Sequence, residues 1–206
     1  MTPRSVSDER HQAAWRGALA LTLVRLALAP VCVALAVVRA PGRSLAAALA
    51  IGFLSDVFDG IVARRGDAAT PGLRRLDSVV DTIFYLAIAY AVWRLHPAVV
   101  RAYRVAIACV IAAELLNYAV AFARFRREAS YHAWSAKAWG LLLLVALELL
   151  FAMGEPRVIP IALVIALLAQ LETLAITLTL PAWDHDVRSV WIALARRRSL
   201  ASVGSV

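Results

Sequence analysis

The stretch of sequence that decides the fold is Ser55–Thr82, SDVFDGIVARRGDAATPGLRRLDSVVDT, which lies between two long apolar runs. Two aspartates end the first run and two begin the second, and these four are Asp56, Asp59, Asp77 and Asp81. Carboxylates at membrane depth are costly to remove from water, so they are tolerated mainly where they face a partner, a cation or a wet cavity. The stretch therefore predicts two membrane helices whose acidic ends share a cation.

The composition of the chain predicts a membrane protein rather than a soluble one. Hydrophobic residues make up 62% of the 206 residues, and the mean hydropathy is +0.74. Soluble domains contain roughly 45–50% apolar residues. The net charge of +8 would suggest a nucleic-acid partner for a soluble protein. Here the arginines cluster between apolar runs, where they orient helices and meet anionic lipid headgroups, so no nucleic-acid partner is expected.

Six apolar runs can each cross a hydrocarbon core, which requires about 20 residues. We therefore predict an all-α integral membrane protein with one domain over residues 17–181, a polar tail over residues 1–16 and a basic tail over residues 182–206. The third run is short and is expected to include Arg75–Asp77 as a polar helical lead-in. The expected spans are Gly17–Val38, Leu45–Val62, Ser78–Trp93, Ala98–Ala123, Trp134–Met153 and Val158–Leu180.

The distribution of arginines predicts the orientation of the chain. Fourteen arginines lie in the two tails and in the second–third and fourth–fifth connections, whereas six lie on the opposite side. By the positive-inside rule, both termini are expected in the cytoplasm, in a multi-pass protein of the plasma membrane. The acidic cluster then lies a turn or two below the cytoplasmic surface. The basic end, Arg196–Arg198, is expected to contact anionic lipid.

The spacing of the four aspartates predicts a metal site. Asp56 and Asp59 are three residues apart and Asp77 and Asp81 are four apart, and either spacing places both side chains on one helical face. A short connection makes the two helices antiparallel neighbours with these faces opposed. Adjacent carboxylates repel unless divalent ions neutralise them, and Mg²⁺ or Mn²⁺ suits such oxygen ligands. Two ions of this kind keep coordination positions open for a diphosphate.

The residues that follow the first pair of aspartates suit a nucleotide. Gly60 lies one turn after Asp56, and Ala63 lies one turn after Asp59, so the face beside the carboxylates is free of bulk. Arg64 stands at the membrane boundary, where it can meet a phosphate or a base.

The whole pattern resembles the signature of the CDP-alcohol phosphotransferases, D-x2-D-G-x2-A-R-x8-G-x3-D-x3-D. Seven of its eight fixed positions match in register, and Leu73 stands where the pattern has glycine. The motif extends over two membrane helices, so it is more specific than a single short motif. The first apolar run adds a weaker similarity to the start of the family, Leu21-Thr22-x2-Arg25-x4-Pro30.

The resemblance implies a six-helix enzyme, usually homodimeric, that moves a substituted phosphate from a CDP-linked donor to an alcohol and releases CMP. It implies that the four aspartates bind two metal ions and that Asp81 also acts as general base on the acceptor hydroxyl. It further implies a nucleotide site lined by Gly60, Ala63, Arg64 and Asp77. The expected donor is CDP-diacylglycerol or a similar CDP-alcohol, and the expected acceptor is a small polar alcohol, phosphorylated or not, used in phospholipid synthesis.

The acceptor site is expected near the start of the fifth run. Lys137, the only lysine, lies in this run close to Ser135, and together with Arg124 it could hold an anionic acceptor. The alternative is a lysine whose ammonium reaches the interface without a substrate role. For Arg25, in the first run, a structural role and a functional role are equally open.

Two further interpretations of the acidic cluster stay open. A divalent-cation transporter would also need an acidic transit site, although it would not need small residues beside the carboxylates. A degenerate family member with a binding or structural role is suggested only by Leu73.

Other polar residues within the apolar runs are expected to pair across helices or to line a cavity or a dimer interface, namely Glu114, Asn117, Glu148 and Glu172. Cys32 and Cys109 are interpreted as small buried hydrophobic residues without a disulfide.

Overall fold

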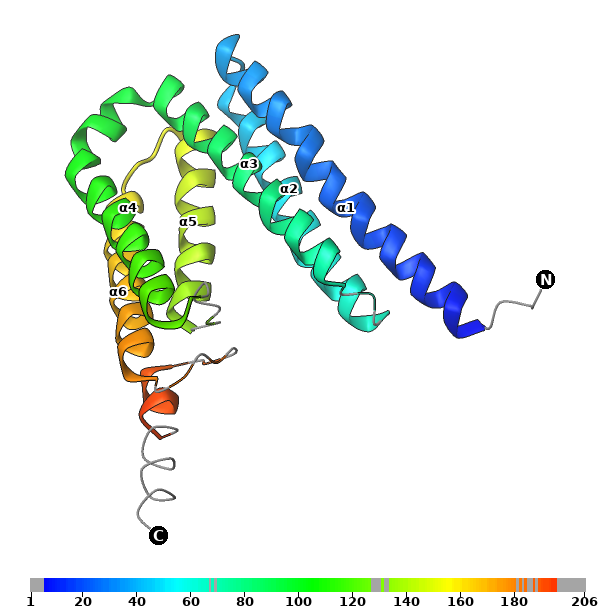
Figure 1. The fold of residues 1–206 in the computed structure, drawn as a ribbon. Coiled ribbons are helices and arrows are strands. Elements are labelled where there is room, and N and C mark those ends of the chain that lie inside the picture. Colours follow the sequence, from blue (N-terminus) through cyan, green and yellow to red (C-terminus); the bar gives the residue numbers. More distant parts are fainter. Residues whose placement is uncertain are drawn as a thin grey trace. The chain divides into compact units, whose positions relative to one another are not determined.

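A computed structural model describes residues 6–66, 68, 70–126, 131, 134–180, 182, 184, 187 and 189–195, and these contain helices and no strand (Figure 1). Six helices of the described chain are long and apolar enough to cross a membrane, which confirms the predicted multi-pass fold. They are α1 (Val6–Val37), α2 (Gly42–Arg65), α3 (Pro71–Leu95), α4 (Pro97–Phe125), α5 (Trp134–Met153) and α6 (Ile159–Thr179). The basic end, Arg196–Arg198, lies outside the described residues.

Helices α1 and α3 begin well before their predicted apolar runs. Helix α1 starts at Val6, so the described part of the expected N-terminal tail is helical. Helix α3 starts at Pro71, because Thr70 is its N-cap and accepts a hydrogen bond from the backbone N–H of Leu73 at 3.3 Å. Proline suits the first helical position, where its missing N–H costs no hydrogen bond. The polar residues ahead of Ser78 therefore form complete helical turns rather than a brief lead-in.

The chain divides into two compact units, of which the first comprises residues 1–100 and 150–154. Within this unit α1 packs along both α2 and α3. Ala18 of α1, Ala63 of α2 and Leu73 of α3 form a buried cluster, in which the small side chains allow close approach of the helices. Helix α1 thus joins the two helices that carry the aspartates.

A glycine sets the contact between α2 and α3. A Cβ atom at Gly52 would lie 2.3 Å from the ring of Phe84, which is fully buried. Only glycine therefore leaves room for this ring against α2.

The second unit comprises residues 101–149 and 155–206. Asn117 of α4 donates to the side chain of Gln170 of α6 at 2.6 Å, and Gln170 in turn donates to Glu114. Ser135 of α5 donates to Glu172 of α6. These bonds confirm the expected pairing across helices for Glu114, Asn117 and Glu172.

The two cysteines are free, as expected, but only one of them is buried. Cys32 has no exposed surface, whereas Cys109 is exposed on α4. The prediction that Cys109 is buried is therefore wrong. Only Asn117 and Ala121 of α4 are buried, so an apolar position on this helix does not imply a buried one.

Candidate active site

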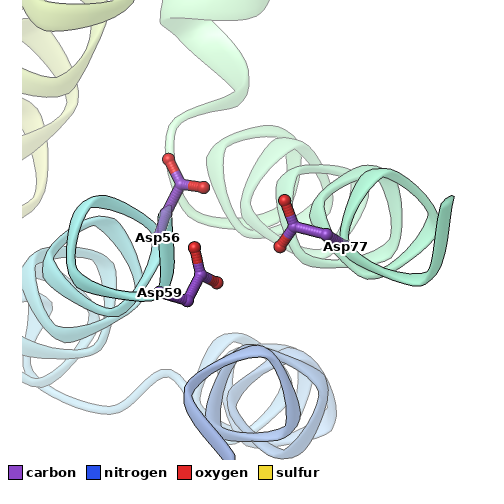
Figure 2. Close-up of side chains that lie close together, drawn as sticks. All are labelled: Asp56, Asp59 and Asp77. Carbon is purple, nitrogen blue, oxygen red and sulfur yellow. The ribbon is translucent and has the colours of Figure 1, made fainter. Parts of the chain in front are cut away.

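Helices α2 and α3 direct three carboxylates into one space. Asp56 and Asp59 on α2 point toward Asp77 on α3 (Figure 2). One oxygen from each of these side chains lies within 4.8 Å of the others. The spacing of three residues on α2 explains why both of its aspartates face the same way.

A buried arginine from a third helix connects all four aspartates. Arg25 of α1 is only 1% exposed. Its Nη1 atom donates to Asp56 at 2.6 Å and also to Asp81. Its Nη2 atom donates to Asp59 and to Asp77. A buried guanidinium needs such partners, because an unpaired charge inside the protein is costly.

A threonine one turn from Arg25 adds to this network. The hydroxyl of Thr22 lies 3.3 Å from Oδ2 of Asp59, the same oxygen that Arg25 contacts, and 3.1 Å from the backbone oxygen of Ala18. Thr22 and Arg25 are three residues apart and therefore share one face of α1.

The cluster is open on the side of the carboxylates and closed on the side of the arginine. The side chains of Asp56, Asp77 and Asp81 are 37%, 32% and 28% exposed, whereas that of Arg25 is 1% exposed. One guanidinium faces four carboxylates, so the cluster is negative when all four are ionised. Such a site attracts cations from its accessible side.

The donor set fits a hard divalent cation. Three carboxylate oxygens within a few ångströms of one another are ligands that Mg²⁺ and Mn²⁺ accept, with coordination positions left over for water or phosphate. Asp81 is not part of this group of three, although it contacts the same arginine. A second metal ion therefore has less support from the side-chain positions than the first.

The residues expected at the nucleotide differ in their surroundings. Ala63 is buried against Ala18 and Leu73. The guanidinium of Arg64 folds back over Gly60, where a Cβ atom would lie 3.0 Å from its Nη1. Arg64 itself is exposed, so its side chain is accessible to a soluble phosphate.

The three residues expected at the acceptor each have a different partner. Arg124 donates to the backbone oxygen of Leu180 at 3.0 Å. Ser135 donates to Glu172, as described above. The ammonium of Lys137 lies 5.1 Å from the centre of the Trp134 ring, and the lysine is exposed. The three side chains thus have no partner in common among these contacts.

Two features of the sequence could have placed Arg25 in the cluster. Arg25 and Thr22 are the residues that carried the weaker similarity in the first apolar run. An arginine in the middle of an apolar run needs an acidic partner, and the aspartate pairs are the nearest such groups in the fold.

Together, the fold and the site define a multi-pass α-helical membrane protein with a group of three carboxylates that could hold a cation. A family model of the CDP-alcohol phosphatidyltransferases matches residues 15–183, and the chain belongs to this family. The match includes α2 to α6, most of α1 and the whole aspartate stretch. The protein is therefore a transferase of substituted phosphate groups, which uses a CDP-alcohol and an alcohol acceptor in phospholipid synthesis. No curated protein and no solved structure matched the chain.

Proposed function

We propose that the protein transfers the phosphatidyl group of CDP-diacylglycerol to a small polar alcohol and releases CMP. The observation that carries this proposal is the meeting of Asp56, Asp59 and Asp77 in one accessible space, with Asp81 bound to the same arginine. The family supplies the class of reaction, and the aspartates supply a place for it.

Asp56, Asp59 and Asp77 would hold Mg²⁺ or Mn²⁺, with Asp81 completing the set for a second ion. The bound ions would neutralise the diphosphate and polarise the phosphorus that is attacked. The three side chains supply oxygen ligands from two helices, which fixes their positions relative to one another.

Asp81 would act as the general base. Its carboxylate would take the proton of the acceptor hydroxyl as the hydroxyl oxygen forms its bond to phosphorus. The bond between that phosphorus and the CMP oxygen breaks in the same displacement, and CMP leaves with the electron pair. Asp81 suits this role because its side chain is 28% exposed and lies outside the group of three carboxylates.

The exposed guanidinium of Arg64 would bind the nucleotide phosphate or base, and Gly60 would leave space beside it. The acyl chains of the donor would lie in the bilayer. We infer that both termini and the site face the cytoplasm, where the nucleotide product is released, and that the enzyme works in the plasma membrane as a homodimer.

Lys137 is our first candidate for binding the acceptor, because it is exposed. Arg124 and Ser135 would contribute after exchanging their present partners, Leu180 and Glu172. In this proposal Lys137→Ala raises the KM for a phosphorylated acceptor and leaves the KM for the donor unchanged. An unchanged acceptor KM would remove Lys137 from the site.

The proposed function is tested by incubating the purified protein with CDP-diacylglycerol, Mg²⁺ and a panel of radiolabelled alcohols. We expect one alcohol to become incorporated into lipid, and we expect CMP to appear in equal amount. A chelator should abolish both products. If no alcohol in the panel is incorporated and CMP stays at background, the proposed donor or reaction is wrong.

A further inference from the structure

Arg25 uses one oxygen of each aspartate and leaves the other oxygen unengaged by its guanidinium. Its bonds go to Oδ1 of Asp56, Oδ2 of Asp59, Oδ1 of Asp77 and Oδ1 of Asp81. Thr22 bonds the same Oδ2 of Asp59 rather than the second oxygen of that carboxylate. All contacts from α1 therefore fall on one oxygen per carboxylate.

The contacts from α1 reach the carboxylates from their buried side. Arg25 is 1% exposed and Thr22 is equally buried, whereas three of the four aspartates have accessible side chains. The α1 side chains therefore form the closed floor of the site. A cation that arrives from the accessible side meets carboxylates whose orientation is already fixed.

We propose that Arg25 is the positioning residue of the metal site, because it orients the four aspartates so that their second oxygens are available to a divalent cation. This inference rests on the metal requirement of the proposed function. Of the structural and functional roles that were open for Arg25, it favours the functional one, toward the metal and not toward the substrate.

The physical reason is the mutual repulsion of the carboxylates. Without a cation between them, the four side chains would turn apart or take up protons, and a metal ion would have to gather them again. A fixed guanidinium removes this cost before the metal binds, just as partners behind metal ligands do in other sites. Its single charge leaves most of the negative charge of the cluster for the metal.

Lysine cannot take over this role. Both Nη atoms of Arg25 bridge two carboxylates each, and its buried Nε has no hydrogen-bond partner among the described residues. The planar fork therefore makes all of these contacts through two separate nitrogens. A lysine ammonium is one compact centre and can orient fewer carboxylates at once.

The inference is tested by measuring Mn²⁺ binding to the purified protein, with electron paramagnetic resonance of free Mn²⁺ as the readout and without any substrate. We expect Arg25→Met to weaken Mn²⁺ binding by about 10- to 100-fold. Arg25→Lys should lose less affinity than Arg25→Met, and Thr22→Val should show a smaller loss. Arg43→Met, which removes an exposed arginine from α2, is the matched control and should bind as the wild type does.

Two results would overturn the inference. Equal Mn²⁺ affinity in the wild type, Arg25→Lys and Thr22→Val would mean that the buried network has no role toward the metal. Tighter binding in Arg25→Lys or Arg25→Met would mean that the guanidinium competes with the metal. Arg25→Lys and Thr22→Val keep the test decisive if Arg25→Met does not fold.

Failure of the proposed function has a different signature from failure of this inference. If the function is wrong, the wild type releases no CMP, but Mn²⁺ affinity still depends on Arg25. If only this inference is wrong, the wild type releases CMP, and the Arg25 variants bind Mn²⁺ as the wild type does.

Discussion

Leu73 shows how a departure from the family signature can be accommodated. The leucine replaces a glycine, yet it lies in the first turn of α3, where it is buried beside Ala18 and Ala63. Its side chain therefore contributes to packing between three helices. This packing explains why a leucine can stand at this position. The leucine therefore does not by itself favour a degenerate, inactive protein.

We expect Leu73→Gly to lower the melting temperature. The free energy of unfolding should fall by about 2–5 kcal/mol for the removal of a buried leucine, and by about 1 kcal/mol more for a glycine within a helix. CMP release per folded molecule should stay near the wild-type rate. Leu73→Ala is the control for the packing contribution. A Leu73→Gly protein that is as stable as the wild type but more active would show that the leucine obstructs the nucleotide site.

The four aspartates should differ in how strongly their removal weakens Mn²⁺ binding. Asp77→Asn removes one oxygen ligand from the group of three and should weaken Mn²⁺ binding by about tenfold or more. Asp81→Asn should weaken Mn²⁺ binding less, because Asp81 lies outside that group. Titration of both variants with Mn²⁺ checks this order, and the reverse order would contradict the assignment of Asp77, rather than Asp81, to the first metal ion.

The contact between α2 and α3 can be tested at a single glycine. We expect Gly52→Ala to lower the melting temperature, because the new methyl group would meet the buried Phe84 ring. Gly140→Ala on α5 is the matched control, since nothing lies within 4 Å of its Cβ position. That variant should be neutral or stabilised by about 1 kcal/mol, which is the helix preference of alanine over glycine. Equal melting temperatures for the two variants would contradict the close packing at Gly52.

The turn between α3 and α4 should make stability depend on pH. His96 caps α3 and lies against Phe151, with ring centres 5.9 Å apart. Burial lowers the pKa of His96, so the unfolded chain binds the proton more readily than the folded protein. Stability should therefore be complete above the ordinary histidine pKa of about 6.5 and should fall as the pH drops below it. Melting temperatures between pH 5 and pH 8 check this, and His96→Gln should reduce the fall in stability at low pH.

The number of helices could be predicted from sequence because each apolar run is long enough to span a membrane. The start of α3 at Pro71 was harder to predict, because the first turns of this helix carry the polar residues Arg74 and Arg75 and resemble a connection between helices. The spacing of the aspartates predicted that α2 and α3 each carry their two carboxylates on one face. The sequence could not predict how α1 is rotated about its own axis. A helix that is apolar on most sides has no hydrophobic stripe that fixes its buried face. The role of Arg25 therefore needed the structure.

The sequence also could not give the side-chain partners of the residues expected at the acceptor site. Arg124, Ser135 and Lys137 lie close together along the chain, but each side chain has its own partner. Sequence proximity does not determine side-chain direction where helices and connections meet.

At the scale of the whole molecule, the buried Arg25 argues against an ion path through the cluster. A cation that enters from the accessible side meets the buried side chains of Arg25 and Thr22, which close the opposite side of the cluster. Proteoliposomes loaded with a metal-sensitive dye should therefore show no Mn²⁺ flux above that of empty vesicles. Flux that Asp59→Asn abolishes would instead support the transporter interpretation.

The orientation of the molecule is tested by labelling from outside the cell. In a protein without Cys32 and Cys109, Glu155→Cys lies in the connection between α5 and α6, and a membrane-impermeant maleimide should label it in intact cells. Fluorescent proteins fused to the two termini should fluoresce, as expected for cytoplasmic ends. Labelling of Glu155→Cys only after the cells are broken would reverse the assigned orientation.

The central claim is that the aspartate cluster activates the diphosphate of a CDP-alcohol. Its most direct test is CMP release from CDP-diacylglycerol by purified wild type and by Asp81→Asn, with saturating Mg²⁺ and the accepted alcohol. We predict rapid release by the wild type and a loss of about 10²- to 10⁴-fold in Asp81→Asn, the usual contribution of a general base. Release by Asp81→Asn at the wild-type rate would contradict this account.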